Sequence, residues 1–322
     1  LRLPCNLIKE NSVYATRLIT IGNFAFMVTF ASPPIQKIDS KVALTQDVEL
    51  YVLRLDLVHP LISGNKWYKL KYNLEAAKRE NIDIILTFGG AYSNHIYATA
   101  AAGKLFGLKT IGVIRGEETL PLNPTLEFAI SQGMQLIYID RQTYRQRHSE
   151  TLHQELFARF GKVFIVSEGG CNLDGVQGCR EIISPDIEFD IACIACGTGT
   201  TLAGVALSLN DKQRVIGFPV LKGGDFLKSD IEGLLGQYQE TKNVSWELVC
   251  NYHFGGYAKV NDELLRFARE FEQEHNIPLD YVYTAKMFYG VMDLVKQGYF
   301  DRCRVLLIHT GGLQGNATKF LE

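Results

Sequence analysis

One lysine of the chain stands at an unusual place for a helix-surface residue. Lys66 follows a Ser-Gly-Asn turn, residues 63–65, and an amphipathic pattern typical of a helix begins beside it. We interpret Lys69 and Lys71, which follow on the same predicted helix, as ordinary surface positions. A lysine amine can attack an aldehyde and form a Schiff base, so Lys66 is a candidate nucleophile. The alternative is a solvated lysine at a helix start, and Lys66 alone does not decide between the two.

A glycine- and threonine-rich turn could bind a phosphate group. It reads C-G-T-G-T-T-L-A-G over residues 196–204, after a buried-strand pattern and at the start of a helix pattern. Backbone amides at a helix start bind anions, and glycines let a ligand approach them closely. The turn lacks the lysine of a Walker loop, and Leu202 stands at the third glycine position of a dinucleotide fingerprint. A phosphate-ended cofactor therefore fits better than a dinucleotide. The predicted phosphate-binding residues are Gly197, Thr198, Gly199, Thr200 and Thr201.

The segment T-F-G-G-A-Y-S-N-H, residues 87–95, could bind a carboxylate. A predicted strand ends at Phe88, two glycines follow, and Ser93 and Asn94 precede a predicted helix. Amides at the positive end of a helix dipole make a site for an anion. A simple helix cap is the alternative, but Gly-Gly together with Ser-Asn-His exceeds what a cap requires.

Further segments place hydroxyl groups at loop edges. Thr310, in L-L-I-H-T-G-G at the end of a predicted strand, can offer a neutral hydroxyl to a ligand, whereas we interpret His309 as a core histidine. Tyrosines occur in F-G-G-Y-A-K, residues 254–259, and in Y-V-Y-T-A-K, residues 281–286. Such tyrosines usually serve packing, but near a cofactor they act as acids or bases when their pKa is shifted.

A scaffold of alternating strands and helices would bring these turns together. Strands are predicted over 48–57, 83–88, 109–115, 134–140, 162–166, 190–196, 214–220, 245–250 and 304–309. Helices are predicted over 67–80, 95–106, 124–132, a long polar stretch that ends at 160, 201–210, 225–238, 261–275 and 284–297. This alternation predicts an α/β fold of two doubly wound parallel-sheet domains. Ligands in such folds bind beyond the carboxyl ends of the strands, where these turns lie.

Composition excludes several classes of function. The 322 residues carry a net charge of −2, with 47% hydrophobic and 21% charged residues, which is ordinary for a globular protein and gives no footprint for nucleic acid. No stretch has the ~18 apolar residues that a membrane span requires. The seven cysteines are scattered and odd in number, which favours a reducing compartment. Cys193 and Cys196 form a C-x-x-C pair inside a buried strand pattern, so we expect core packing rather than a metal or redox site.

The N-terminal segment is atypical. Residues 18–31 are apolar, with Arg17 before them and Ser-Pro-Pro after them. A signal-peptide core is one interpretation. We favour an extension that lies on the fold or adds a hairpin.

The motifs together resemble a known family. They are S-G-N-K (63–66), G-G-A-Y-S-N-H (89–95), G-T-G-T-T-L-A-G (197–204), G-G-Y (255–257), Y-T-A-K (283–286) and H-T-G-G (309–312). In order and spacing they resemble the D-cysteine desulfhydrase and 1-aminocyclopropane-1-carboxylate (ACC) deaminase group of pyridoxal-phosphate enzymes, with the tryptophan-synthase β-like fold. The resemblance spans roughly residues 33–312.

The resemblance implies roles in binding pyridoxal 5′-phosphate. Lys66 would hold the cofactor through a Schiff base, and Asn94 would hydrogen-bond its phenolic oxygen. Residues 197–201 would bind the phosphate, and Thr310 would meet the pyridine nitrogen. A lysine at the cleft, a phosphate turn and an anion-binding turn thus form one consistent set.

The resemblance also implies a substrate side. Ser93, Asn94 and His95 would receive the carboxylate of a small amino acid, and Ser93 would also take part in catalysis. Tyr257 and Tyr283 would flank the substrate as acid–base groups. Thr284 would lie against the substrate.

Three positions separate the two activities of this group. ACC deaminases of the group carry glutamate after the active-site tyrosine, leucine before the last Gly-Gly and glutamine after Ser-Asn. This chain has Thr284, Thr310 and His95 there. The resemblance therefore implies β-elimination of D-cysteine to pyruvate, ammonia and hydrogen sulfide, with Lys66 taking the α-proton. ACC deamination to 2-oxobutanoate and ammonia is the alternative.

The chain departs from the group near the predicted site entrance, and other classes of function remain as alternatives. Tyr68 and Ile96-Tyr97 stand where the group tends to have arginine, which bears on substrate choice. A nucleotide-dependent oxidoreductase would require a complete glycine fingerprint. A catalytically silent binding protein would have no need of Lys66.

We expect a division into two domains. Residues 1–69 with 166–322 are predicted to form the large cofactor-binding domain, with 1–31 as its atypical extension, and 70–165 the small domain. We also expect a cytoplasmic homodimer that acts on a small amino acid, without a metal, nucleic-acid or membrane partner.

Overall fold

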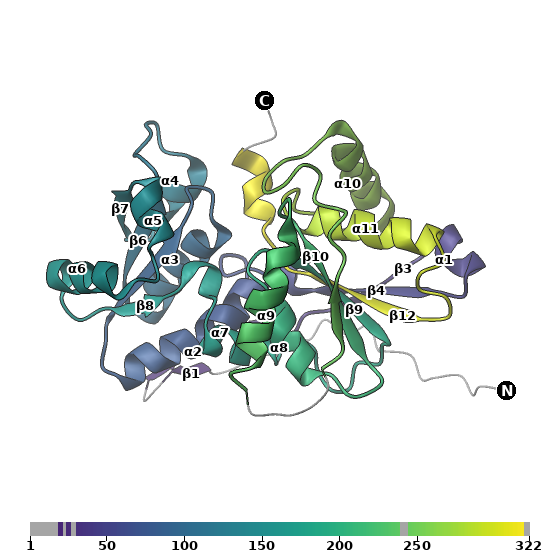
Figure 1. The fold of residues 1–322 in the computed structure, drawn as a ribbon, viewed down its shortest axis with the longest axis horizontal. Coiled ribbons are helices and arrows are strands. Elements are labelled where there is room, and N and C mark those ends of the chain that lie inside the picture. The colour runs from purple at the N-terminus through teal and green to yellow at the C-terminus, as the bar shows by residue number, and fades with distance from the viewer. Residues whose placement is uncertain (1–18, 22–23, 27–29, 239–243, 319–322) are drawn as a thin grey trace.

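The chain is built around two separate parallel sheets (Figure 1). This computed structural model describes residues 19–21, 24–26, 30–238 and 244–318. One sheet has six strands in the order β11-β10-β9-β12-β4-β3, and the other has four in the order β7-β6-β5-β8. Neighbouring strands run parallel except β3, which is antiparallel to β4. The predicted α/β fold with two doubly wound sheets is confirmed.

The elements have the following bounds. The larger sheet contains β3 (Ile35–Ile38), β4 (Glu49–Arg54), β9 (Ile191–Cys196), β10 (Arg214–Pro219), β11 (Trp246–Leu248) and β12 (Arg304–His309). The smaller contains β5 (Ile84–Gly89), β6 (Lys109–Arg115), β7 (Gln135–Ile139) and β8 (Phe164–Val166). The helices are α1 (Lys41–Thr45), α2 (Asn65–Arg79), α3 (Asn94–Phe106), α4 (Pro124–Ser131), α5 (Arg141–Arg145), α6 (Glu150–Phe160), α7 (Leu173–Cys179), α8 (Thr200–Ser208), α9 (Leu227–Leu235), α10 (Asp262–His275) and α11 (Thr284–Lys296).

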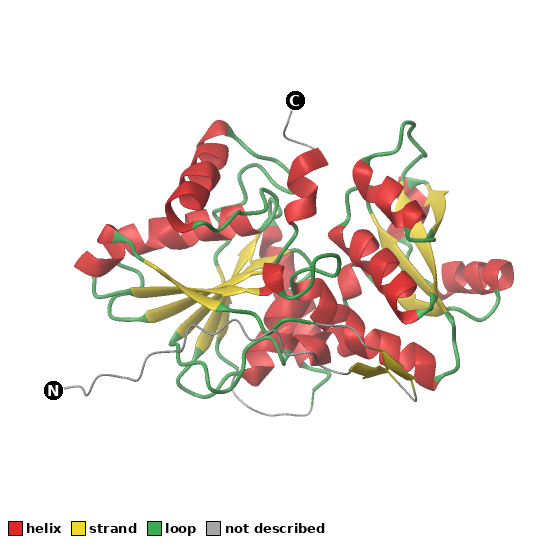
Figure 2. Cartoon of the chain, turned by 180° about the vertical axis from the view of Figure 1, so that it is seen from behind, coloured by secondary structure: helices red, strands yellow, loops and turns green. Residues whose placement is uncertain are grey.

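Apolar clusters cover both faces of each sheet. On one face of the larger sheet, α11 packs through Phe288, and on the other, α2 and α8 pack through Leu70 and Leu202. The smaller sheet is covered by α5 through Tyr144 on one face and by α3 through Ile96 on the other. Figure 2 shows this layering from behind, with helices on both sides of the strands. Helices must cover both faces because each parallel strand needs a crossover connection to the next.

Several short elements differ from the sequence expectations. The predicted polar helix ending at residue 160 is two helices, α5 and α6, because the Ser149 side chain accepts a hydrogen bond from the amide of Leu152 and starts a new helix. Helix α7 was not predicted because Gly175 and Gly178 lower its intrinsic propensity. Strand β3 and the five-residue helix α1 were also not predicted.

The cysteine pair lies in the core. Strand β9 alternates between the two apolar clusters of the larger sheet, so Cys193 belongs to one cluster and Cys196 to the other. The two thiols therefore point to opposite faces and cannot share a metal ion. Burial raises the pKa of Cys196 to about 12 and that of Cys193 further, which keeps both protonated. The interpretation as core residues is confirmed.

Part of the atypical N-terminal segment forms paired strands. Strand β1 (Ile19–Ile21) is antiparallel to β2 (Phe24–Phe26), and β1 contacts α2. The rest of the predicted extension up to residue 29 lies outside the described residues. Across the described ranges, none of the helices has both the length and the apolar character to cross a membrane.

The contact between α2 and α7 depends on a glycine. A β-carbon at Gly178 would lie 1.7 Å from the carbonyl oxygen of Tyr68. Backbone atoms cannot move aside as a flexible side chain can. Gly178 is therefore required for the two helices to approach this closely.

Replacing Gly178 should destabilise the fold. We expect Gly178→Ala to lower the free energy of unfolding by about 3 kcal/mol, the upper end for overpacking a tight core contact. Gly233→Ala, in the exposed face of α9 with nothing within 4 Å, is the matched control and should raise it by up to about 1 kcal/mol. Urea unfolding followed by circular dichroism measures both. Equal stability of the two variants would contradict the inferred contact.

Candidate active site

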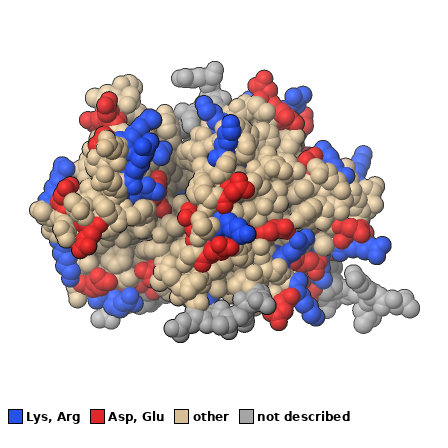
Figure 3. All heavy atoms as spheres, in the orientation of Figure 1, with Lys and Arg blue, Asp and Glu red and all other residues tan. Residues whose placement is uncertain are grey.

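The predicted functional turns meet where the strands of the two sheets end. Turns after β4, β9 and β12 of the larger sheet lie against the turn after β5 of the smaller one. Figure 3 shows the surface hollowed between the two lobes, with positive and negative side chains interspersed on this face. The hollow lies at the carboxyl ends of parallel strands, where α/β folds bind ligands.

Asn65 connects three of these turns. Its backbone amide donates to the carbonyl oxygen of Thr310 at 3.2 Å, and its side-chain Nδ2 donates to Thr201 Oγ1 at 2.9 Å. Its Oδ1 accepts from Lys66 Nζ at 2.7 Å. Gly64 before it has φ +67°, and a β-carbon there would lie 1.9 Å from the Thr310 oxygen. The Ser-Gly-Asn turn is thus shaped by a close backbone crossing that only glycine allows.

Lys66 has the properties of a nucleophilic amine. Burial of the ammonium, reinforced by the nearby charge of Lys69, lowers the pKa of Lys66 to about 7. Asp280 acts in the opposite direction but does not compensate. An ordinary lysine has a pKa near 10.4, so it is almost entirely protonated at neutral pH. The lowered pKa gives Lys66 a substantial neutral fraction there, and a neutral amine is what attack on an aldehyde requires.

Lys69 is part of the site, and our interpretation of it as a surface residue is wrong. Its side chain is 5% exposed, and Nζ donates to Gly169 O at 3.0 Å and to Thr198 Oγ1 at 3.4 Å. Lys69 lies one helical turn beyond Asn65 on α2, so both face the same side. Lys71 instead forms an ion pair with Glu181 at the surface of the α2–α7 contact.

The predicted phosphate turn opens α8. Gly199, at φ +75°, precedes the helix, and Thr198 Oγ1 lies 3.0 Å from Thr200 Oγ1. Amides at the start of α8, threonine hydroxyls and the Lys69 ammonium therefore converge on one small region. A β-carbon at Gly199 would meet Ile231 at 2.5 Å, so this glycine is also needed for packing. The arrangement fits a dianionic phosphate.

Ser93 and Asn94 start helix α3 on the smaller lobe. Ser93 Oγ accepts from the amides of His95 and Ile96 at 3.2 and 3.3 Å, which is a helix cap. Asn94 Oδ1 accepts from Gln314 Nε2 at 2.9 Å, a bond between the two lobes. This bond from Gln314 fixes the orientation of the Asn94 side-chain amide, whose Nδ2 is then its donor group.

His95 lies beneath this turn in the core. Thr87 Oγ1 donates to Val166 O at 2.7 Å, so His95 Nε2 is the donor in its 2.9 Å contact with Thr87 Oγ1. His95 Nδ1 is then an acceptor, and it has no partner within the described residues. Burial, with Lys66 and Lys69 nearby, holds the pKa of His95 well below its usual value, so the ring is neutral. The predicted contact of His95 with a substrate carboxylate stays a prediction.

Two tyrosines face each other beside the phosphate turn. The hydroxyls of Tyr257 and Tyr283 are 3.5 Å apart, and their rings pack edge to face. A β-carbon at Gly197 would lie 3.1 Å from the ring of Tyr283. Desolvation of the hydroxyls raises the pKa of both tyrosines, that of Tyr283 well above its usual value, although the Tyr257 residue as a whole is 43% exposed. Both phenols are therefore protonated at neutral pH and can donate hydrogen bonds.

Asp280 is a buried acid that sequence reasoning missed. It is 1% exposed, and Oδ1 accepts from the amide of Tyr283 at 2.6 Å. Burial raises its pKa to about 7 and outweighs the effect of the amide donors. Thr284 is fully buried, and its hydroxyl bonds the backbone of Asp280. The predicted contact of Thr284 with a substrate stays a prediction. Asp280 could not be predicted from the sequence, because an acidic residue in a turn follows no periodic pattern.

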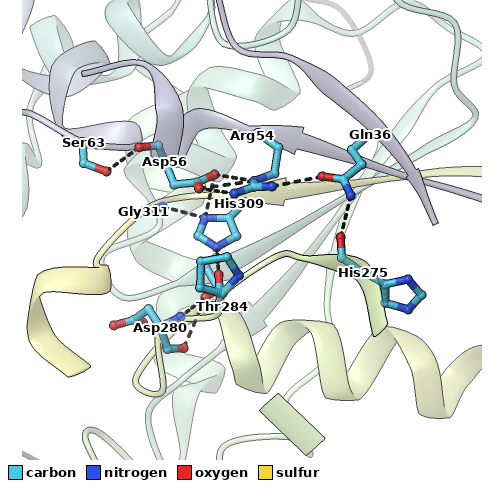
Figure 4. A network of polar contacts seen from close by, with 10 residues as sticks. Gln36, Arg54, Asp56, Ser63, His275, Asp280, Thr284, His309 and Gly311 are labelled. Atoms are coloured by element: carbon cyan, nitrogen blue, oxygen red, sulfur yellow. Dashed lines mark hydrogen bonds and ion pairs between the residues drawn. The ribbon is translucent and has the colours of Figure 1, made fainter. Parts of the chain in front are cut away.

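A buried polar network supports these turns from behind (Figure 4). Arg54 forms three hydrogen bonds with Asp56, and Asp56 Oδ1 lies 3.3 Å from His309 Nδ1. His309 Nε2 lies 2.7 Å from Pro278 O, and Nδ1 accepts from the amide of Gly311 at 3.2 Å. The interpretation of His309 as a core histidine is confirmed. It fixes the Thr310–Gly311 turn against the start of α2.

The fold and site define an enzyme that uses pyridoxal phosphate, and known proteins agree. Residues 34–311 match the family described as pyridoxal-phosphate dependent enzyme, and the chain belongs to it. A Pyrococcus horikoshii protein, named provisionally as an ACC deaminase, is 32% identical over 83% of this chain and 85% of its own. An Arabidopsis thaliana mitochondrial protein, named bifunctional D-cysteine desulfhydrase/ACC deaminase, is 28% identical over 94% and 81%. The crystal structure of an ACC deaminase homologue is 31% identical with a TM-score of 0.79, covering 88% and 90%.

These findings confirm the predicted family, fold and cofactor. The site fits pyridoxal phosphate because it combines a buried amine of low pKa with an anion cradle whose glycines leave room for a ligand. These findings exclude the two alternatives, a nucleotide-dependent oxidoreductase and a catalytically silent binding protein. The individual residue roles stay predictions.

Loss of the Lys69 ammonium should weaken cofactor binding. A charge-assisted hydrogen bond contributes roughly 1.5–3 kcal/mol, so we expect Lys69→Met to bind pyridoxal phosphate about 10- to 100-fold more weakly. Lys71→Met, from the same helix, should bind it normally because Lys71 pairs with Glu181. Fluorescence titration of the apoprotein gives both affinities. Equal affinity in the two variants would place the phosphate elsewhere.

The pKa of Lys66 predicts how cofactor capture depends on pH. The neutral fraction rises as the pH rises through about 7, so covalent capture should increase about tenfold per pH unit below 7 and level off above about 8. Apoprotein mixed with pyridoxal phosphate, reduced with borohydride at early times and mapped by mass spectrometry gives the rate at each lysine. A main adduct on Lys69, Lys71 or Lys286 would contradict the assignment, as would a rate still rising at pH 9.

Proposed function

We propose that the protein catalyses deaminating β-elimination of D-cysteine. With uptake of one water, the products are pyruvate, ammonia and hydrogen sulfide. The pair of protonated tyrosines beside the phosphate turn carries the proposal, because it supplies acids where a leaving group would depart. The bifunctional name of the Arabidopsis relative supports the same class of reaction.

Each site residue has a proposed role at the cofactor. When bound, pyridoxal phosphate supplies an aldehyde that captures the substrate amine and a conjugated ring that withdraws electrons from the α-carbon. Lys66 holds the cofactor, residues 197–201 with Lys69 hold its phosphate, and Asn94 donates Nδ2 to its phenolic oxygen. Thr310 offers its hydroxyl to the pyridine nitrogen.

The substrate side follows from the same geometry. Ser93 and Asn94 at the start of α3 bind the substrate carboxylate, with His95 behind them. Lys66, as a neutral amine, takes the α-proton at Nζ. Tyr283 or Tyr257 gives its proton to the departing sulfur, which leaves as hydrogen sulfide.

The domain division completes the proposal. Residues 1–69 with 166–322 form the lobe that holds the cofactor. Residues 70–165 form the lobe that contributes Ser93 and Asn94, with the boundary inside α2, whose Leu70 still packs against the larger sheet. The larger lobe thus supplies Lys66 and the two tyrosines, and the smaller lobe supplies the helix start that binds the substrate carboxylate.

ACC deamination is a second candidate because of Asp280. Opening a cyclopropane ring lacks a good leaving group, so it needs a stronger electron sink than thiolate loss does. Thr284 and Thr310 stand where ACC deaminases of this group carry glutamate and leucine, which favours D-cysteine. The carboxyl of Asp280, however, lies within 3.0 Å of the space that a β-carbon at Gly312 would fill, next to Asn94. Asp280 therefore gives the site a carboxyl that a comparison of His95, Thr284 and Thr310 alone does not reveal.

A substrate comparison tests the choice. We expect kcat/KM for D-cysteine to exceed that for ACC by at least about tenfold, a difference of ~1.4 kcal/mol in transition-state stabilisation. Pyruvate and sulfide from D-cysteine, and 2-oxobutanoate from ACC, are measured with one enzyme preparation. A higher value for ACC, or reaction with L-amino acids alone, would overturn the choice, and Tyr68 and Ile96 would be the first positions to examine.

A matched pair of tyrosine variants separates chemistry from general damage. Tyr283→Phe should lower kcat for D-cysteine by about 10²- to 10⁴-fold, the range for loss of a general acid. Tyr299→Phe removes the same hydroxyl from an exposed tyrosine that bonds Glu247 and should leave kcat unchanged.

We further propose a cytoplasmic homodimer. The cysteines at positions 171, 179, 193, 196, 250 and 303 are free thiols, which supports a reducing compartment. Sedimentation of the purified protein measures the mass of the assembly.

A further inference from the structure

We propose that Lys286 is a positioning residue that holds the loop of residues 253–259 in the conformation that presents Tyr257 to the active site. The inference rests on the proposed acid role of Tyr257. Lys286 lies in the Y-T-A-K segment, but neither the cofactor nor the substrate roles above involve it.

The Lys286 side chain is directed into the protein, toward this loop. It is fully buried on the first turn of α11, and Nζ donates to His253 O at 2.9 Å and to Gly256 O at 2.7 Å. Burying an ammonium is costly unless its N–H groups find acceptors. The carbonyls of His253 and Gly256, which accept these bonds, belong to one short loop. The burial of Lys286 and the folding of the loop therefore depend on each other.

The loop needs such support because its backbone is strained. Four of its residues have positive φ, and two of them carry side chains: Phe254 at 51° and Ala258 at 54°. Gly255 and Gly256 supply the others, at 88° and 120°. Residues with a β-carbon rarely adopt this region and do so only where the surroundings hold them.

The loop's own hydrogen bonds converge on the same two carbonyls. His253 O accepts from the amide of Gly256 at 3.0 Å, and Gly256 O accepts from the amide of Lys259 at 3.1 Å. Lys286 adds a charged donor to each. Hydrogen bonds from charged donors are stronger than those between neutral groups. Lys286 therefore reinforces both turns of the loop at once.

The same helix start fixes the second tyrosine. Tyr283 stands directly before α11 and Lys286 lies three residues later. Tyr283 packs beside Gly197 of the phosphate turn, while Lys286 holds the loop that carries Tyr257. One helical turn thus sets the separation of the two phenols. Lys286 acts through Tyr257 and has no part in proton transfer itself.

Hydrogen exchange and a double-mutant cycle test this role. In Lys286→Met, which keeps the length of the side chain and removes its donors, amides of residues 253–259 should exchange at least tenfold faster. The kcat for D-cysteine should fall about as far as in Tyr257→Phe, and Lys286→Met should cause no further loss in the Tyr257→Phe background. Cofactor affinity should change less than twofold.

Two further variants serve as controls. Lys296→Met, at the exposed end of the same helix, should leave exchange and kcat unchanged. Lys286→Gln keeps an N–H donor and should give intermediate effects, so it carries the test if Lys286→Met does not fold.

The outcomes separate this inference from the proposed function. Unchanged exchange in the loop overturns the proposal, and so do independent, multiplicative losses of kcat in the double variant. If D-cysteine is not a substrate, the exchange measurement still decides whether Lys286 holds the loop, and the double-mutant cycle uses the amino acid that does react in the substrate comparison.

Discussion

The active site depends on one backbone crossing between Gly64–Asn65 and Thr310. At this point the start of α2 and the turn after β12 approach so closely that no β-carbon fits between them. Asn65 then uses its amide, Nδ2 and Oδ1 to connect Thr310, Thr201 and Lys66. Three turns that are far apart in the sequence are thereby fixed relative to one amine. Packed helices and the buried Arg54–Asp56–His309 network hold the crossing from behind.

Burial affects the pKa values of the charged groups in this site more than ion pairing does. Lys66 is partly buried and Asp280 is buried nearby, and an ion pair would raise the pKa of the lysine and lower that of the acid. Burial shifts both pKa values the opposite way, each to about 7, because desolvation of the charged forms outweighs their attraction. The two groups can therefore exchange between charged and neutral forms at neutral pH. Such groups are characteristic of sites where protons move.

Sequence patterns predicted the elements better than the contacts between them. Strands β6 and β12 have the predicted bounds because apolar runs end at charged or polar residues and glycines. Helix α7 could not be predicted, because its glycines oppose a helix locally. Gly178 is explained by the approach of α2, and Gly175 by the close carbonyl oxygen of Gly170. Lys69 was misjudged for a similar reason. Its partners Gly169 and Thr198 lie 100 and 129 residues away, and the amphipathic pattern of α2 carries no information about them.

The contact of Gly197 with the ring of Tyr283 links the two halves of the site. A phenol that would face the substrate rests on the turn that would hold the cofactor phosphate, and a β-carbon at Gly197 would lie only 3.1 Å from its ring. Natural or engineered changes at Gly197 or Tyr283 must therefore be compatible with both the cofactor and the substrate. Substrate range in this protein can be altered more freely from the side of the smaller lobe, at the start of α3. There the two lobes meet through long side chains, such as that of Gln314 of the larger lobe, which bonds Asn94 and can adjust its conformation.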